Sequence, residues 1–156
     1  MKKQIVIIGG GASGLMAGIT AAKKGAVVTI LEAADKPGKK LLATGNGRCN
    51  FTNVLQDKSC YRGSANDLAM NVVNQFSVSD TLMYPNSDEA RAVLDVLLME
   101  ACNLKIKIKT RERVQDVRRK NQRWKVKTST WEYPADSVII TSGSPAGTDE
   151  KTDPFV

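Results

Sequence analysis

The sequence predicts an α/β protein in which buried parallel strands alternate with helices, and three observations lead to this prediction. A run of apolar, β-branched residues at 5–8 ends in glycines, and residues 12–22 follow with the composition of a helix. A second apolar run occupies 27–31, and a third occupies 137–141 near the other end of the chain. Apolar runs without polar alternation are typical of strands buried on both faces of a parallel sheet.

Composition and charge are those of an ordinary globular protein. A chain of 156 residues can bury one core, and 42% apolar with 25% charged residues is usual for such a domain. The apolar run 5–8 is too short for the core of a signal peptide, and no run reaches the length of a membrane span, so we expect a cytoplasmic protein. The three cysteines lack CxxC spacing and histidine is absent, which predicts reduced thiols and no metal site. Without histidine as a general base, chemistry would come from a cofactor.

A glycine motif marks the turn after the first strand. Gly9, Gly11 and Gly14 have the spacing GxGxxG, and the predicted helix begins near Ala12. Glycines permit a tight turn and let backbone amides approach a phosphate at the positive end of a helix dipole. Glu32 ends the second strand, where a carboxylate can accept hydrogen bonds from a ribose. The combination predicts dinucleotide binding rather than another kind of glycine-rich turn, and the carboxylate favours FAD or NAD because it would repel the 2′-phosphate of NADP.

Residues 33–54 are predicted to form a long loop. Loops of this length in compact domains are usually functional or disordered. Its glycines, cations and amides suit a pyrophosphate or a polar ring edge. A solvated surface loop is the alternative that composition leaves open.

The remaining elements are predicted from their periodicity. Apolar stripes predict helices at 65–77 and 88–102, both packed on the core rather than on a ligand. Residues 104–109 alternate apolar and basic, which predicts a strand with one polar face. A β-meander is expected to lead into the buried strand at 137–141, with its own strands at 114–117, 124–128 and 131–133.

Basic residues concentrate in one segment. The net charge is +7, but residues 105–127 carry eleven Lys or Arg and two acids, a balance of +9. Interleaved with Trp124, these cations could bind the phosphates and bases of a nucleic acid. We prefer the simpler interpretation that they form the solvated face of strands, which makes nucleic acid an unfavoured partner.

The chain resembles a known family at its most distinctive stretch. Residues 38–53, GKKLLATGNGRCNFTN, together with the glycine motif and Glu32, are similar to the BaiN/YhiN-type NAD(P)/FAD-dependent oxidoreductases, which include the aminoacetone oxidase family FAD-binding enzymes. The likeness extends to about residue 146. It implies a Rossmann-type, three-layer FAD/NAD(P)-binding domain with a β-meander crossover. It also implies FAD as cofactor and NAD(P)H as a candidate electron donor.

The resemblance implies which residues hold the cofactor. Amides at Ala12 and Ser13 would join the motif glycines at the pyrophosphate, and Glu32 would hold the adenosine ribose. The backbone of Val114 would meet the adenine. Toward the flavin would lie Lys40, Asn46, Gly47 and Arg48, with Ser142 and Gly143 at the turn after the last strand.

The chain departs from the family pattern in its extent. We expect an FAD-binding domain over 1–147, an internal deletion near 82–84 and an unrecognised tail at 148–156. We further expect the substrate domain of the family to be missing from a truncated protein, whose exposed surfaces could drive self-association.

Three functions stay open at this point. The first is a flavin-dependent oxidoreductase that uses NAD(P)H or a small amine or carbonyl substrate, or the cofactor domain of such an enzyme. The second is a non-catalytic nucleotide-binding remnant, and the third, more distant, is nucleic-acid binding through residues 105–127. No catalytic residue and no substrate are predicted.

Overall fold

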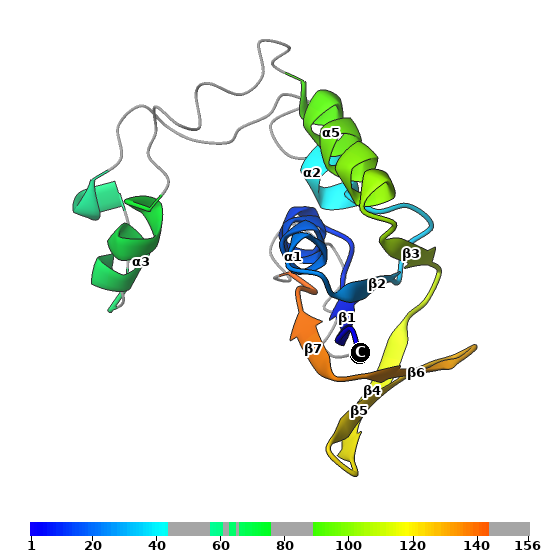
Figure 1. Cartoon of the computed structure of the whole chain (residues 1–156). Coiled ribbons are helices and arrows are strands. Elements are labelled where there is room, and N and C mark those ends of the chain that lie inside the picture. The colour runs from blue at the N-terminus through cyan, green and yellow to red at the C-terminus, as the bar shows by residue number, and fades with distance from the viewer. Residues whose placement is uncertain (44–56, 61–62, 65, 76–88, 144–156) are drawn as a thin grey trace.

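The computed structural model describes residues 1–43, 57–60, 63–64, 66–75 and 89–143. Within this part of the chain a four-stranded parallel sheet has helices on one face and a three-stranded antiparallel sheet on the other, which confirms the predicted three-layer α/β fold (Figure 1). The elements are β1 (Gln4–Ile8), α1 (Ala12–Lys23), β2 (Val27–Glu32), α2 (Lys39–Ala43), η2 (Lys58–Cys60), α3 (Asn66–Val73), α5 (Ala90–Asn103), β3 (Lys107–Thr110), β4 (Val114–Lys120), β5 (Arg123–Thr128), β6 (Glu132–Ala135) and β7 (Ser137–Ile140).

The parallel sheet has the strand order β3-β2-β1-β7. In its register Ile8 of β1 lies opposite Leu31 of β2 and Ile140 of β7, so these three strands end side by side. Ligands of open parallel sheets bind beyond the carboxyl ends of the strands. The glycine motif and Glu32 therefore lie at the same edge of the sheet.

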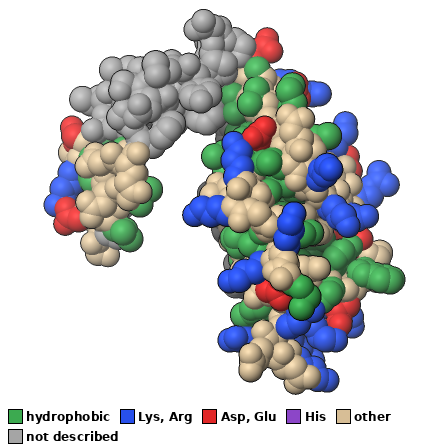
Figure 2. All heavy atoms as spheres, viewed as in Figure 1, with side chains coloured by type: hydrophobic (Ala, Val, Ile, Leu, Met, Phe, Trp, Pro, Cys, Tyr) green, Lys and Arg blue, Asp and Glu red, His purple; other side chains and the backbone are tan. Residues whose placement is uncertain are grey.

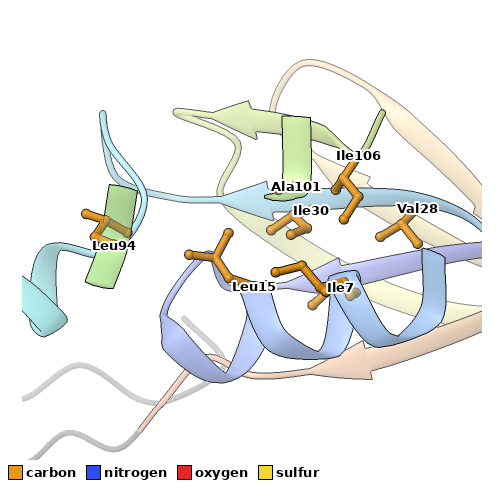
Figure 3. Packing of buried hydrophobic residues seen from close by; sticks show 8 residues of the cluster. Ile7, Leu15, Val28, Ile30, Leu94, Ala101 and Ile106 are labelled. Atoms are coloured by element: carbon orange, nitrogen blue, oxygen red, sulfur yellow. The ribbon is translucent and has the colours of Figure 1, made fainter. Parts of the chain in front are cut away.

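The central strand is buried on both faces, as its unbroken apolar run predicts. Ile7 faces the helices with Ile30 of β2 and Leu15 of α1, and none of the three is exposed to solvent (Figure 3). Val6 faces the other way and packs with Val126 of the meander. Each such aliphatic side chain stabilises the fold by roughly 1.5–3 kcal/mol.

The meander forms as predicted. β4 pairs with β5 and β5 with β6, all antiparallel. The β4–β5 turn lies at Asn121 and Gln122, which both have positive φ, 50° and 64°. Two consecutive residues with positive φ are typical of a two-residue hairpin turn, whose twist matches that of the strands it joins.

The strand predicted at 104–109 is shorter in the structure. α5 continues to Asn103, and the amide of Ile106 then donates to the carbonyl of Ala101, which closes the helix. Lys105 at this turn has a φ of 57°, so β3 begins only at Lys107. The alternation itself is confirmed, because Ile106 is buried and Ile108 packs against the same core.

Two other predictions need correction. The stripe at 65–77 was expected to pack on the core, but no residue of α3 is buried, and Leu68 and Val72 are 65% and 61% exposed. Figure 1 shows α3 away from the sheet. The loop predicted at 33–54 contains the helix α2, which begins at Lys39 directly after the Pro37–Gly38 turn.

An ion pair joins the two helices that cover the sheet. Lys23 Nζ lies 2.9 Å from Glu100 Oε1, and hydrogen bonding by Lys23 lowers the pKa of Glu100. A carboxyl whose pKa is lower in the folded state stabilises the fold above its unfolded pKa, and this contribution is lost as the pH falls through the folded value.

We therefore expect Glu100→Gln to lower the melting temperature slightly at pH 7, with the difference from wild type shrinking as the pH falls toward pH 3. The effect stays small because both side chains are well exposed. Thermal melts followed by circular dichroism at several pH values measure it. A deficit that persists unchanged at pH 3 would mean that packing, not charge, causes it.

Some of the predicted features lie outside the described residues. These are the expected deletion near 82–84, the tail at 148–156 and residues 46–48. Among the helices that the structure does describe, none is both long and apolar enough to cross a membrane.

Candidate nucleotide-binding site

The glycine turn is held by contacts that leave no room for side chains at two of its positions. Gly9 has a φ of 104°, and its amide donates to the carbonyl of Leu31 at 2.8 Å. A Cβ on Gly9 would overlap the carbonyl oxygen of Thr141, and a Cβ on Gly14 would overlap the carbonyl oxygen of Gly9. These two glycines therefore let β1, α1 and the end of β7 meet backbone to backbone.

Gly11 is in the opposite situation. It is the N-cap of α1 in extended backbone, and among the described residues no heavy atom except those of its chain neighbours lies within 4 Å of where its Cβ would be. No side chain caps the helix, whose first intrahelical bond runs from the amide of Leu15 to the carbonyl of Gly11. The amides of Ala12, Ser13 and Gly14 thus have no intrahelical acceptor and lie at the positive end of the helix dipole. Such a helix start can bind a phosphate.

Glu32 is held beside this turn by two backbone amides. Its Oε2 accepts a hydrogen bond from the amide of Gly10 at 2.7 Å, and its Oε1 accepts one from Ala34 at 2.8 Å. Each carboxylate oxygen keeps a further lone pair. The carboxylate is therefore fixed in place and can still accept hydrogen bonds from ribose hydroxyls, as the sequence predicts.

A second turn supports the glycine motif from the side. The amide of Gly38 donates to the carbonyl of Gly10 at 2.9 Å. Gly38 has a φ of 74°, and a Cβ there would overlap the side chain of Leu94 on α5. Lys40, predicted to lie along the cofactor, is an exposed residue of α2, which starts at this turn.

The connection from β3 to β4 closes over the end of β2. The amide of Arg111 donates to the carbonyl of Ala34 at 2.8 Å, and that of Glu112 donates to the carbonyl of Glu32 at 2.9 Å. Val114, where β4 begins, is half-buried against the meander side of the core. Val114, the predicted adenine-contacting residue, thus lies two residues after Glu112, whose backbone amide contacts Glu32 directly.

The turn after β7 reaches the glycine motif from the other side. Thr141 donates through its amide to the carbonyl of Ile8 at 2.8 Å, and its Oγ1 lies 2.9 Å from the same oxygen and 3.0 Å from the carbonyl oxygen of Gly9. Ser142 and Gly143 follow and are exposed, with Gly143 at a φ of 83°. Of the thirteen predicted site residues, Asn46, Gly47 and Arg48 lie outside the described part of the chain, so their placement stays a prediction.

The sequence of the domain matches a described family. Residues 3–83, more than half of the chain, match the HI0933-like protein Rossmann domain. The chain belongs to the HI0933-like family. Over 92% of its length it is 42% identical to a protein of Clostridium scindens named 3-dehydro-bile acid delta(4,6)-reductase. Over 88% of its length it is 23% identical to the ribosomal RNA dihydrouridine synthase of Escherichia coli. These matches confirm the resemblance predicted from the glycine motif and residues 38–53.

Solved structures confirm the Rossmann-type fold of this HI0933-like domain. A ferredoxin-flavin thioredoxin reductase from Clostridium acetobutylicum superimposes with a TM-score of 0.59 at 22% identity, over 92% of this chain and 38% of that one. The thioredoxin reductase of Lactococcus lactis gives 0.58 at 18% identity, over 89% and 35%. At these identities the likeness concerns the fold. The HI0933-like chain also spans only 39% and 38% of the two curated relatives.

Four residues that support the HI0933-like site were not predicted from the sequence: Ala34, Gly38, Glu112 and Thr141. Thr141 was assigned to the last strand, and only its contact with the carbonyl of Gly9 shows its second role. The pair Pro37–Gly38 was a usable signal, since such a pair marks a turn. Nothing in the sequence indicates that this turn contacts Gly10.

The basic segment of the HI0933-like chain lies mainly on the meander. Arg119 stacks over the ring of Trp124 at 5.8 Å, and a hollow of about 400 Å³ at the hairpin tip is lined by Lys120, Asn121, Arg123, Trp124, Lys125 and Pro134. Figure 2 shows basic side chains over this lower part of the molecule with acidic ones among them. Three of the cations form ion pairs, Arg118 with Asp116, Arg123 with Asp136 and Lys125 with Glu132. The interpretation as a solvated strand face, partly neutralised, remains the preferred one.

Proposed function

We propose that this HI0933-like chain is the FAD-binding domain of a flavin-dependent oxidoreductase. The observation that carries the proposal is the uncapped start of α1, open at Gly11, with the Glu32 carboxylate fixed next to it by Gly10. A helix start of this kind can bind the phosphates of a nucleoside diphosphate, and such a carboxylate can bind its ribose hydroxyls.

The residues present fit the ADP half of the cofactor. A Cβ at Gly11 would enter the space proposed for a phosphate, and apart from its chain neighbours no described residue comes within 4 Å of that Cβ. Glu32 keeps acceptor capacity for the ribose and would repel a 2′-phosphate, which supports FAD over NADP at this site. The residues proposed for the flavin end are Lys40, Asn46, Gly47, Arg48, Ser142 and Gly143.

The proposal extends to the activity of the whole protein. A bound flavin would supply hydride acceptance and donation, and the protein would bind and orient it. We propose NAD(P)H as electron donor and a small amine- or carbonyl-type substrate. The name of the Clostridium scindens relative, a reductase, supports a redox reaction.

A second candidate function is nucleotide binding without turnover. It is favoured by the extent of the chain, which spans less than two fifths of the curated relatives it matches. The groups that the structure gathers at the carboxyl edge of the sheet account for the ADP half of FAD. Within the described residues, these groups do not include a surface that would hold a substrate.

Titration of the purified chain with FAD, ADP and FMN tests the proposal. We expect FAD and ADP to bind and to compete, while FMN, which lacks the adenosine, binds much more weakly. A colourless chain that takes up no FAD would overturn the proposal. If FAD does bind, NAD(P)H oxidation above the rate of free flavin would exclude the second candidate function, nucleotide binding without turnover.

Location and assembly are part of the same proposal. The three cysteines, an odd number without CxxC spacing, fit reduced thiols and support a cytoplasmic location. β7 is an edge strand of the described sheet and its Ile140 is 54% exposed, which supports self-association along that edge.

A further inference from the structure

The position of the base follows from the order of the strands. A pyrophosphate at the β1–α1 turn and a ribose at the end of β2 define a direction across the sheet, from β1 toward β2. Continued by one strand, this direction leads to the end of β3 and to residues 111–114. The base would therefore face the backbone of this connection.

The backbone at this point departs from regular pairing. Val114 lies opposite Thr128, but the next pair is Asp116 with Lys127, so β4 carries one more residue than β5. Such a bulge leaves its extra residue out of the ladder. The ladder is thus interrupted next to Val114, the residue whose backbone is expected to meet the adenine.

The side chain of Glu112 ties this connection to the third layer. Its Oε1 accepts a hydrogen bond from Oγ1 of Thr130 at 2.7 Å, in the turn between β5 and β6. That turn is itself ordered by Thr128, which is only 2% exposed and whose Oγ1 accepts from the amide of Trp131 at 3.0 Å. The connection that faces the base is therefore anchored at its backbone on Glu32 and at its side chain on Thr130.

The carboxylate of Glu112 is surrounded by hydroxyl groups. The hydroxyls of Thr128 and Thr130 lower its pKa, so the carboxylate is charged at neutral pH. Burial and the charge of Glu112 raise the pKa of Tyr133, which keeps that phenol protonated. The second oxygen of Glu112, Oε2, is buried and has no hydrogen-bond partner within the described residues.

We propose that Glu112 is a positioning residue for adenine. By holding residues 111–114 against the β5–β6 turn, it fixes the backbone groups that distinguish adenine from hypoxanthine. This inference rests on the proposed function, because it presupposes that the site takes an adenine nucleotide.

The test compares ADP with IDP, whose hypoxanthine has a carbonyl in place of the amino group. Isothermal titration of the whole chain should show that wild type prefers ADP by about tenfold, which corresponds to roughly one hydrogen bond. In Glu112→Ala the ADP affinity should fall to that of IDP, while the IDP affinity stays. Glu112→Gln should keep the preference, since its amide oxygen can still accept from Thr130.

Two further variants separate positioning from folding. Thr130 is exposed, so Thr130→Val should fold and yet lose the ADP preference, because it removes the donor to Glu112. Glu132→Gln removes an exposed carboxylate paired with Lys125 on the same sheet and should behave as wild type.

The outcomes distinguish the two proposals. An unchanged ADP to IDP ratio in Glu112→Ala and Thr130→Val would overturn the positioning role alone. So would an equal loss of affinity for both nucleotides with a lower melting temperature, which is the result of a purely structural role. A wild-type chain that binds neither ADP nor FAD would overturn the proposed function and this inference with it.

Discussion

Gly14→Ala lowers the free energy of unfolding by about 3 kcal/mol or more, because the added methyl group has no space to occupy. Its Cβ would overlap the carbonyl oxygen of Gly9 and would lie 2.8 Å from Oγ1 of Thr141. The overlapped atom is the carbonyl oxygen of Gly9, and the amide of the same residue donates to the carbonyl of Leu31. A shift of the Gly9 backbone would therefore disturb the contact between β1 and β2. Urea denaturation followed by circular dichroism measures the loss.

Gly18→Ala is the matched control on the same helix. Its Cβ would meet the side-chain end of Ile30 at 3.1 Å, which can give way by a small rotation. Alanine also gains up to about 1 kcal/mol over glycine inside a helix, so the net change should stay within about 1 kcal/mol. Equal destabilisation by the two variants would show that the contact between Gly14 and Gly9 is not the cause.

Gly11→Ala weakens the binding of FAD and ADP by about a hundredfold or more, a loss of roughly 3 kcal/mol, while the fold is retained. The new Cβ would stand in the open space before α1, where the pyrophosphate is proposed to lie. Gly11 has a φ of −75°, which alanine adopts without strain. The poorer N-cap should reduce the free energy of unfolding by no more than about 1 kcal/mol. Fluorescence titration with FAD and isothermal titration with ADP give the affinities.

The pair of variants makes the result interpretable. Gly18→Ala should bind ADP as wild type does, because its methyl group faces the core. If Gly11→Ala binds ADP with unchanged affinity, the pyrophosphate does not lie at the start of α1. The assignment of the site to the glycine motif would then be wrong, whatever the fold.

The sequence alone was sufficient for the elements whose signal is local. The unbroken apolar run of β1 predicted a strand buried on both faces, and Ile7 and Val6 do face opposite layers. The glycine spacing and Glu32 also predict where a nucleotide would lie; the structure places Glu32 against the glycine turn through the Gly10 amide, and the nucleotide position itself stays a prediction.

Predictions that required knowledge of a distant partner were less successful. The stripe of α3 has the period of a core helix, yet nothing in the described residues covers Leu68 and Val72. Periodicity shows that a helix has an apolar face but not what lies against it. The alternation at 104–109 was right in phase, and its start was wrong because the closing bonds of α5 extend to Ile106.

The sequence by itself determined the strands, the first helix and the chemical character of the nucleotide site, since each is set by side chains close together in the chain. Only the tertiary structure decided how that site is held: Thr141 against Gly9, Gly38 against Gly10, and Glu112 against Thr130. These contacts join residues far apart in sequence, and two of the three have a backbone carbonyl as acceptor, which every residue type possesses. Residue identity therefore does not indicate which partner each of these residues meets.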